Sequence, residues 1–172
     1  MPSRSKNKGS GYERDVAKFL SSLYGESFIR VPGSGAYIGG KNTGRKEVLH
    51  EGQVRTFKGD IVPGQSFPRM NAECKFYADF PFHQLFIGDV KVLESWIDQC
   101  MVVADEGDFN ILFMKFNRKG TYIAVQTHQG TQNIQLSRHF TYGSENHGNW
   151  IIMDFKEFFK LNSETVKELC SN

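Results

Sequence analysis

Two short apolar segments in the second half of the chain constrain the fold most. "FNILFMKF" (109–116) and "TYIAVQT" (121–127) are rich in β-branched and aromatic residues, and only "NRKG" separates them. Apolar runs of this length on either side of a polar, Gly-containing turn predict a β-hairpin. From Asp89 to Asp105, apolar residues recur on one broad helical stripe, so we expect a helix that covers the sheet.

The rest of the chain adds helices and strands around this hairpin. We predict a helix over 10–24, a short strand over 27–32, a strand over 59–63 that pairs in a hairpin with a strand over 70–77, a strand over 149–155, and a terminal helix from Asp154 that is interrupted near Asn162. The polar stretch 128–148 carries no such prediction. This order of elements predicts an α/β fold with one central mixed β-sheet flanked by α-helices.

Composition fits one globular domain over residues 1–172. Of the 172 residues, 39% are hydrophobic and 13% aromatic, which a packed core requires and a disordered chain lacks. No apolar run approaches the roughly 20 residues of a membrane span, and the N-terminus lacks the apolar part of a secretory signal. We therefore expect a cytoplasmic protein. Its three cysteines, Cys74, Cys100 and Cys170, show no CxxC spacing, which favours free thiols over disulfides or structural zinc.

Positive charge is concentrated at the start of the chain. Residues 1–50 hold nine Lys or Arg against four acids, a balance of +5, whereas residues 51–172 hold twelve against fifteen, a balance of −3. We predict a flexible basic arm at 1–9 and a basic Gly-rich loop that bind DNA phosphates, although a solubilising tail has the same composition. The predicted DNA-binding residues in these segments are Arg4, Lys6, Lys8, Lys41, Arg45 and Lys46.

The stretch "NAECKFY" (71–77) places an acid and a base two positions apart in a strand. Side chains alternate along a strand, so Glu73 and Lys75 emerge on the same face. If the preceding strand pairs here, Asp60 brings a second carboxylate within a few ångströms, and two such anions repel unless a cation lies between them. Oxygen ligands suit Mg²⁺, which completes its shell with water and phosphate. Lys75 is then suited to orient or deprotonate the attacking water, or to stabilise transition-state charge.

A structural interpretation of the same residues is an exposed cross-strand ion pair, which contributes little. The chain repeats the acid-x-Lys pattern at Asp89 and at Asp154, where it looks structural. Asp89 precedes the apolar-striped helix. Asp154 and Glu157 are spaced as a capping box at a helix start. The Glu73 copy differs because it lies on a strand that follows a second acid-bearing strand.

Four motifs together resemble the archaeal-type Holliday junction resolvases, nucleases of the PD-(D/E)xK superfamily. "GSGYERDVAKFL", "FIRVPGSG", "GDIV" and "AECK" occur in the order found in that family, over about Lys8 to Lys75 and loosely to about Val125. The resemblance implies a restriction-endonuclease-like core and a homodimer. It also implies symmetric nicking of four-way DNA junctions with Mg²⁺, for which Mn²⁺ is a possible substitute.

Site residues carry over from the resemblance by position. Asp60, Glu73 and Lys75 match the acids and the lysine, and the carbonyl of Cys74 is a further candidate ligand. Glu13, in the "ER" pair of the first helix, matches a residue that assists metal binding. One departure is that Gly59 stands where the family has Pro before the first acid. The stretch between Gly35 and Gly59 is also longer than in the family, which leaves the substrate preference open.

Four of the candidate residues also have structural interpretations. Ser34 lies near the scissile phosphate in the resemblance and is predicted to be catalytic, but it is also a typical turn residue between two glycines. Glu13 is spaced with Ser10 as a capping box. Arg30 either contacts phosphate or projects from a strand edge. Gln99 either braces the lysine, as in some nucleases of the superfamily, or forms a solvated helix flank.

These observations predict a Mg²⁺-dependent endodeoxyribonuclease that resolves branched DNA by hydrolytic phosphodiester nicking, as in recombination and repair. Phosphate contacts of this kind predict salt-sensitive binding with little sequence dependence. Two alternatives stay open. The first is a PD-(D/E)xK nuclease that cuts ordinary duplex or flapped DNA in repair or restriction. The second is a DNA-binding module without catalysis.

Overall fold

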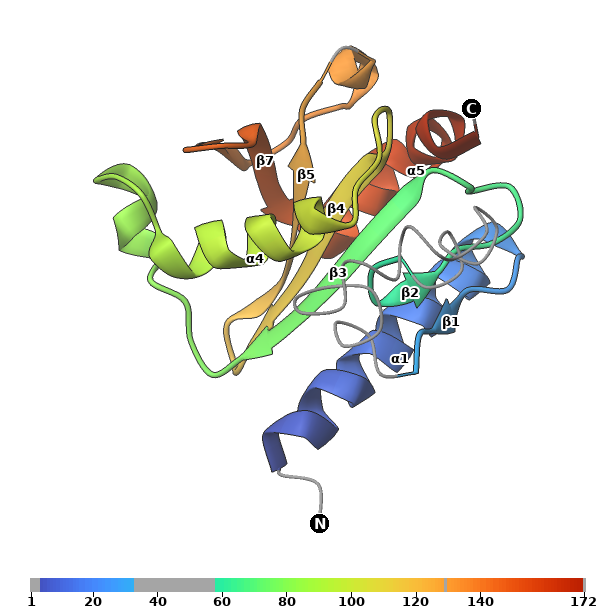
Figure 1. Cartoon of the computed structure of the whole chain (residues 1–172), viewed down its shortest axis with the longest axis horizontal. Helices are drawn as coiled ribbons and strands as arrows, with labels where there is room; N and C mark the ends of the chain where they lie inside the picture. Colours follow the sequence, from blue (N-terminus) through green and yellow to red (C-terminus); the bar gives the residue numbers. More distant parts are fainter. Residues whose placement is uncertain (1–3, 33–57, 129, 172) are drawn as a thin grey trace.

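The computed structural model describes residues 4–32, 58–128 and 130–171 (Figure 1). Its elements in chain order are α1 (Arg4–Tyr24), β1 (Ile29–Arg30), β2 (Ile61–Val62), β3 (Met70–Tyr77), the short 3₁₀ helix η2 (Phe82–Phe86), α4 (Lys91–Val102), β4 (Phe109–Phe116), β5 (Gly120–Gln126), the 3₁₀ turn η3 (Thr131–Asn133), β6 (His139–Ser144), β7 (Gly148–Asp154) and α5 (Phe155–Ser171).

A five-stranded mixed sheet forms the centre of the molecule. Its strand order is β3-β4-β5-β7-β6; β3 and β4 run parallel, and each of the other neighbouring pairs is antiparallel. The predicted α/β fold is confirmed, as are the β4–β5 hairpin and the span of β3. Since β3 is the first strand in this order, one of its edges has no neighbour in this sheet among the described residues; we call it the open edge of β3.

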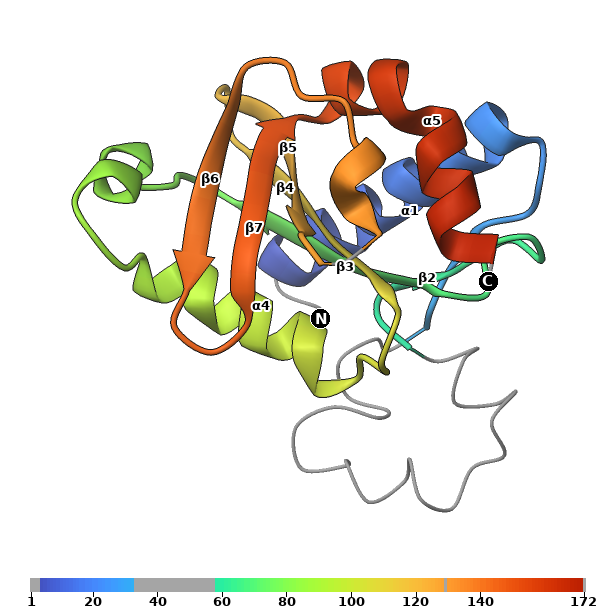
Figure 2. The same ribbon diagram turned by 90° about the horizontal axis from the view of Figure 1, so that it is seen from above.

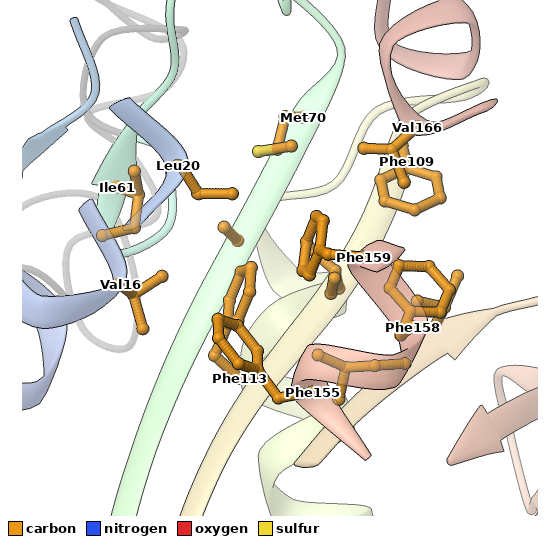
Figure 3. Close-up of a cluster of buried hydrophobic side chains, with 14 of the residues drawn as sticks. Val16, Leu20, Ile61, Met70, Phe109, Phe113, Phe155, Phe158, Phe159 and Val166 are labelled. Atoms are coloured by element: carbon orange, nitrogen blue, oxygen red, sulfur yellow. The ribbon is translucent and has the colours of Figure 1, made fainter. Parts of the chain in front are cut away.

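Helices cover both faces of the sheet because its strands are apolar on both sides (Figure 2). Along β4, Ile111 and Phe113 pack into the core under α1 and α5, whereas Leu112 and Met114 pack under α4. Figure 3 shows the α1 and α5 side of this core, where phenylalanines of α5 interdigitate with those of β4. Helix α1 ends where Gly25 takes a left-handed φ of 67° and donates its N–H to Ser21, a common helix C-terminus.

The predicted hairpin between 59–63 and 70–77 is wrong. β2 instead pairs antiparallel with β1 in a separate two-stranded sheet, with Ile29 opposite Val62. Contact with β3 is made one residue earlier, where the Asp60 N–H donates to the Ala72 carbonyl over 2.8 Å. The positive φ of Gly59, 65°, turns the chain at this point, so Asp60 rather than a full strand lies along β3.

Two other predictions differ from the structure, and one strand was not predicted. Helix α1 begins at Arg4, not Ser10. The polar stretch 128–148 contains strand β6, which the sequence hides because only Tyr142 of its six residues is buried. Helix α5 continues through Asn162, because this buried side chain donates to the carbonyls of Phe158 and Gln135 within the fold instead of breaking the helix.

Two further expectations concern cysteines and membranes. All three cysteines are free thiols, as predicted. Within the described ranges, no helix has both the length and the apolarity of a membrane span. The single nuclease domain over 1–172 and the flexibility of the arm at 1–9 stay predictions.

Candidate active site

Asp60 is fixed at the open edge of β3 by two backbone contacts. Its N–H donates to the Ala72 carbonyl over 2.8 Å, and its Oδ2 accepts the N–H of Cys74 over 2.7 Å. The N–H and C=O of one strand residue point to the same side of the strand. The Cys74 carbonyl is therefore directed to the edge at which the Asp60 carboxylate lies.

Gly59 makes this close approach possible. A Cβ on residue 59 would lie 2.4 Å from the Ala72 carbonyl oxygen, and its φ of 65° is one that side-chain-bearing residues rarely adopt. Proline cannot adopt it at all, since its ring fixes φ near −65°. The departure from the Pro of the resolvase pattern is therefore a geometric requirement of the way this chain approaches β3.

Glu73 and Lys75 share the face of β3 that α4 covers. The Lys75 Nζ donates to Glu73 Oε1 over 2.6 Å and also to Gln99 Oε1 on α4. Burial alone would lower the pKa of Lys75, but the carboxylate of Glu73 outweighs it, and the pKa is raised. Without a bound metal, Lys75 is therefore a cation at neutral pH that can donate hydrogen bonds.

The carboxylate of Glu73 lies in an environment that disfavours its charged form. Burial raises its pKa to about 7, the negative charge of Asp60 adds to the rise, and Lys75 opposes it. Asp60 thus lies near enough to Glu73 for its charge to contribute to the raised pKa. The structure places Asp60 at the edge of β3, and Glu73 and Lys75 form an ion pair on the same strand.

Glu13 reaches the same region from α1. Burial raises its pKa; its hydrogen bond from Arg30 opposes the rise, and the charge of Asp60 adds to it. The predicted capping box with Ser10 is wrong, because the helix starts at Arg4 and position 10 lies within it. Arg30 donates through Nε to Glu13 Oε2, a partner that neither of its two predicted roles included.

The carboxylate and carbonyl oxygens at this site are ligands of the kind that a hard divalent ion prefers. Among the described residues, no three His, Cys, Asp or Glu side chains are grouped closely enough to hold a metal. Mg²⁺, however, commonly takes only one or two carboxylates and fills its shell with water and substrate phosphate. Asp60 and Glu73, with the carbonyl of Cys74, meet that requirement. Mutual repulsion of the two acids is the condition that a bound cation would relieve.

The structure leaves several candidate residues untested. Ser34, Lys41, Arg45 and Lys46 lie outside the described residues. Arg4 and Lys6 belong to α1, but their side chains are outside the description, and Lys8 is exposed near the start of the helix. The catalytic, metal-binding and DNA-binding roles assigned from the sequence all stay predictions.

A chain of hydrogen-bonded amide side chains behind the site was not predicted from the sequence. Asn71, fully buried, donates its Nδ2 to the Cys100 carbonyl over 2.9 Å and to Asn110 Oδ1 over 2.7 Å. Asn110 in turn donates to Gln126 Oε1 over 2.8 Å. Carbonyls of the last helical turn have no partner inside the helix, so Asn71 holds the end of α4 against β3. The available signal was one amide residue in each of three apolar strands.

A comparison of the chain with models of known protein families agrees with the geometry of the site. A family model described as "Phage putative PDDEXK endonuclease" matches residues 4–168. The chain belongs to this family. The mixed sheet flanked by helices is compatible with the restriction-endonuclease-like fold of PD-(D/E)xK nucleases, which generally use divalent metals. The match supports the superfamily but not the archaeal-type resolvases in particular. No curated protein and no solved structure matches the chain.

The hydrogen bond from Lys75 to Gln99 leads to a testable prediction. In Gln99→Met, Lys75 loses an acceptor that holds its Nζ in place, and we expect kcat to fall about tenfold, or about 1.4 kcal/mol, with little change in KM. Because Gln99 is exposed, the melting temperature should stay near that of wild type. Steady-state cleavage kinetics check this, with the exposed Gln84→Met on η2 as the control. An unchanged kcat in Gln99→Met would contradict the role.

The raised pKa of Glu73 predicts how the stability of the fold depends on pH. A buried acid whose pKa rises from 4.5 to about 7 contributes stability that is complete below pH 4.5 and is lost as pH rises through 7. In EDTA, the melting temperature of wild type should therefore fall between pH 5 and pH 8 by about 5 °C more than that of Glu73→Gln. Parallel melting curves for the two proteins would contradict the assignment.

Proposed function

We propose that the chain is a divalent-metal-dependent endodeoxyribonuclease that hydrolyses phosphodiester bonds of branched DNA, with the four-way junction as its substrate. The observation that supports the proposal is the position of Asp60 at the open edge of β3, next to the buried Glu73–Lys75 ion pair of the same strand. Two buried, mutually repelling carboxylates beside a lysine are costly to a fold, which favours a catalytic use over a structural one.

The residues have separate tasks in this proposal. Asp60 and Glu73 hold the ion, with the Cys74 carbonyl as a further oxygen and Glu13 in support. When bound, a divalent ion such as Mg²⁺ or Mn²⁺ lowers the pKa of water and neutralises phosphate charge. Lys75 donates hydrogen bonds that orient the attacking water or stabilise the charge that builds on the phosphate oxygens. Gln99 limits the positions that the Lys75 ammonium can occupy.

The junction substrate rests on the resemblance of four motifs to archaeal-type resolvases. Family membership supports equally well a nuclease that cuts ordinary duplex or flapped DNA. A junction carries two equivalent strands to be cut, so the resolvase form of the proposal includes a homodimer with one site for each strand. Basic residues at the start of the chain and in the Gly-rich loop would bind the DNA backbone.

A cleavage assay on a matched set of substrates tests the proposal. Wild type is incubated with Mg²⁺, Mn²⁺ or EDTA and a labelled four-way junction, a flapped duplex or a linear duplex that share one sequence. Metal-dependent nicks placed symmetrically in the junction, with slower cutting of the other two, support the resolvase. Preferential cutting of the flap or the linear duplex would show that the junction is not the preferred substrate, and would support the alternative nuclease. No product with either metal overturns the nuclease and leaves the DNA-binding module.

A further inference from the structure

Lys115 occupies a position where the pattern of β4 calls for an apolar side chain. Ile111 and Phe113 face the core under α1 and α5, and residue 115 is the next on that face. Its side chain is half-buried, and its Nζ lies 5.0 Å from the ring centroid of Phe76 and 5.6 Å from that of Tyr12. A cation at a core-facing sheet position breaks the local pattern, as residues with a function often do.

Lys8 interrupts the apolar row of α1 next to the same aromatic ring, Phe76. The buried residues Tyr12, Val16 and Leu20 repeat at intervals of four, and Lys8 lies one interval before them. Side chains four apart share a helix face, so Lys8 extends the core-facing row beyond the apolar part. Its Nζ lies 5.8 Å from the ring centroid of Phe76. Two ammonium groups thus gather around one aromatic ring.

Lys8 and Lys115 differ from Lys75 and Lys119, which each form an ion pair with a neighbouring acid. In the part of the chain that the structure describes, no carboxylate lies within ion-pair distance of Lys8 or Lys115. Aromatic rings attract cations, but two like charges at one ring still repel each other. An anion bound between them would offset that repulsion.

The cluster lies near the candidate active site on the same strand, but on the other face of the sheet. Side-chain alternation directs Phe76 to the face that α1 covers, and Glu73 and Lys75 to the face that α4 covers. Glu73 and Phe76 are three residue steps apart, about 10 Å along the strand at about 3.3 Å per step, which is about the length of three nucleotides at about 3.4 Å each. Contact with both sites therefore requires the DNA backbone to run across the open edge of β3. Figure 1 shows the first turns of α1 and the carboxyl end of β3 on the same side of the molecule.

We propose that Lys8 and Lys115, held over Tyr12 and Phe76, bind the phosphate backbone of the DNA a few nucleotides from the bond that is cut. This inference rests on the proposed function in that DNA is the ligand. The two ammonium groups contact backbone phosphates and read no bases, so the contact is independent of sequence. The aromatic rings hold the lysine stems in position before DNA arrives, which reduces the entropy lost on binding.

The decisive variant is Lys115→Met, because its effects on stability and on binding have opposite signs. Methionine suits a half-buried position among aromatic rings, so the melting temperature should be unchanged or higher. The dissociation constant for a labelled duplex or junction should rise about three- to tenfold at about 0.1 M salt. The slope of log Kd against log salt should fall by about 0.9, the value for one lost phosphate contact.

Two controls make the comparison specific. Lys160→Met removes one charge from an exposed position on α5 and should leave affinity and salt slope near wild type. Lys115→Arg keeps the charge, so its affinity and its salt slope should both stay near those of wild type. Lys8→Met is the second test variant, with the same expected loss of slope. Binding is measured by fluorescence anisotropy in EDTA, so that cleavage does not interfere.

The outcomes separate this inference from the proposed function. If wild type cuts DNA but Lys115→Met and Lys160→Met bind it equally, the phosphate contact is wrong and the nuclease stands. If wild type does not cut DNA but Lys115→Met alone weakens binding and lowers the salt slope, the contact stands and the nuclease is wrong. If wild type does not bind DNA, both are wrong.

Discussion

Asp60→Asn is expected to lower kcat for DNA cleavage by about 10³-fold, or about 4 kcal/mol, while the free energy of unfolding changes little. An amide has the shape of a carboxylate, and its oxygen can still accept the Cys74 N–H that now bonds to Asp60 Oδ2. It carries no charge, so it is a poor ligand for Mg²⁺. DNA affinity in EDTA should stay at the wild-type value or rise, because one negative charge near the phosphates is removed.

The matched control is Asp154→Asn. Asp154 begins a second acid-x-Lys pattern and accepts the Glu157 N–H at the start of α5, a capping role that Asn performs equally well. This variant should cut DNA at the wild-type rate. Single-turnover cleavage with saturating enzyme, together with thermal melting of each protein, measures both effects. If Asp60→Asn is folded and retains more than about a tenth of wild-type activity, Asp60 does not hold the ion.

Gly59→Ala is expected to damage both stability and activity. The new Cβ would lie 2.4 Å from the Ala72 carbonyl oxygen, a backbone atom that can move only if the edge of β3 moves. Left-handed φ adds about 1 kcal/mol for a residue with a side chain. We expect a loss of about 3 kcal/mol in the free energy of unfolding. We also expect a fall of about 10²-fold in kcat, because Asp60 is displaced with its neighbour.

Gly25→Ala separates the steric clash from the backbone strain. Gly25 has almost the same φ, 67°, but a Cβ there would meet nothing within 4 Å. It should lose only about 1 kcal/mol and keep its kcat. Urea denaturation and cleavage kinetics on both variants make the comparison. Equal losses of stability would show that the approach of Gly59 to β3 is looser than the structure describes.

Local patterns predicted the parts of the fold that depend on neighbours in sequence. The span of β3, the β4–β5 hairpin and the stripe of α4 each follow from short-range periodicity, and all three are confirmed. Strand β6 could not be predicted, because it is an edge strand and only its pairing with β7 makes it a strand. The pairing of β1 with β2 is set by contacts between distant segments, on which periodicity carries no information.

The candidate site divides in the same way. Alternation along β3 placed Glu73 and Lys75 on one face, and the structure bears this out. Asp60 reaches them by a route that the sequence did not predict, through a turn at Gly59 instead of a hairpin. The amide contacts of Asn71 depend on which strands and helices become neighbours, so local patterns could not predict them.

The position of Asp60 on the edge of β3 also bears on how this edge meets other protein chains. Exposed strand edges invite foreign strands to pair with them, and proteins usually block such edges with charge, bulges or covering segments. Here the backbone groups of Ala72 and Cys74 are already bonded to Asp60, which also brings a negative charge to the margin of the sheet. We therefore expect Asp60 to limit pairing of foreign strands with this edge, so that substitutions that move residue 60 away from β3 would lower the solubility of the protein.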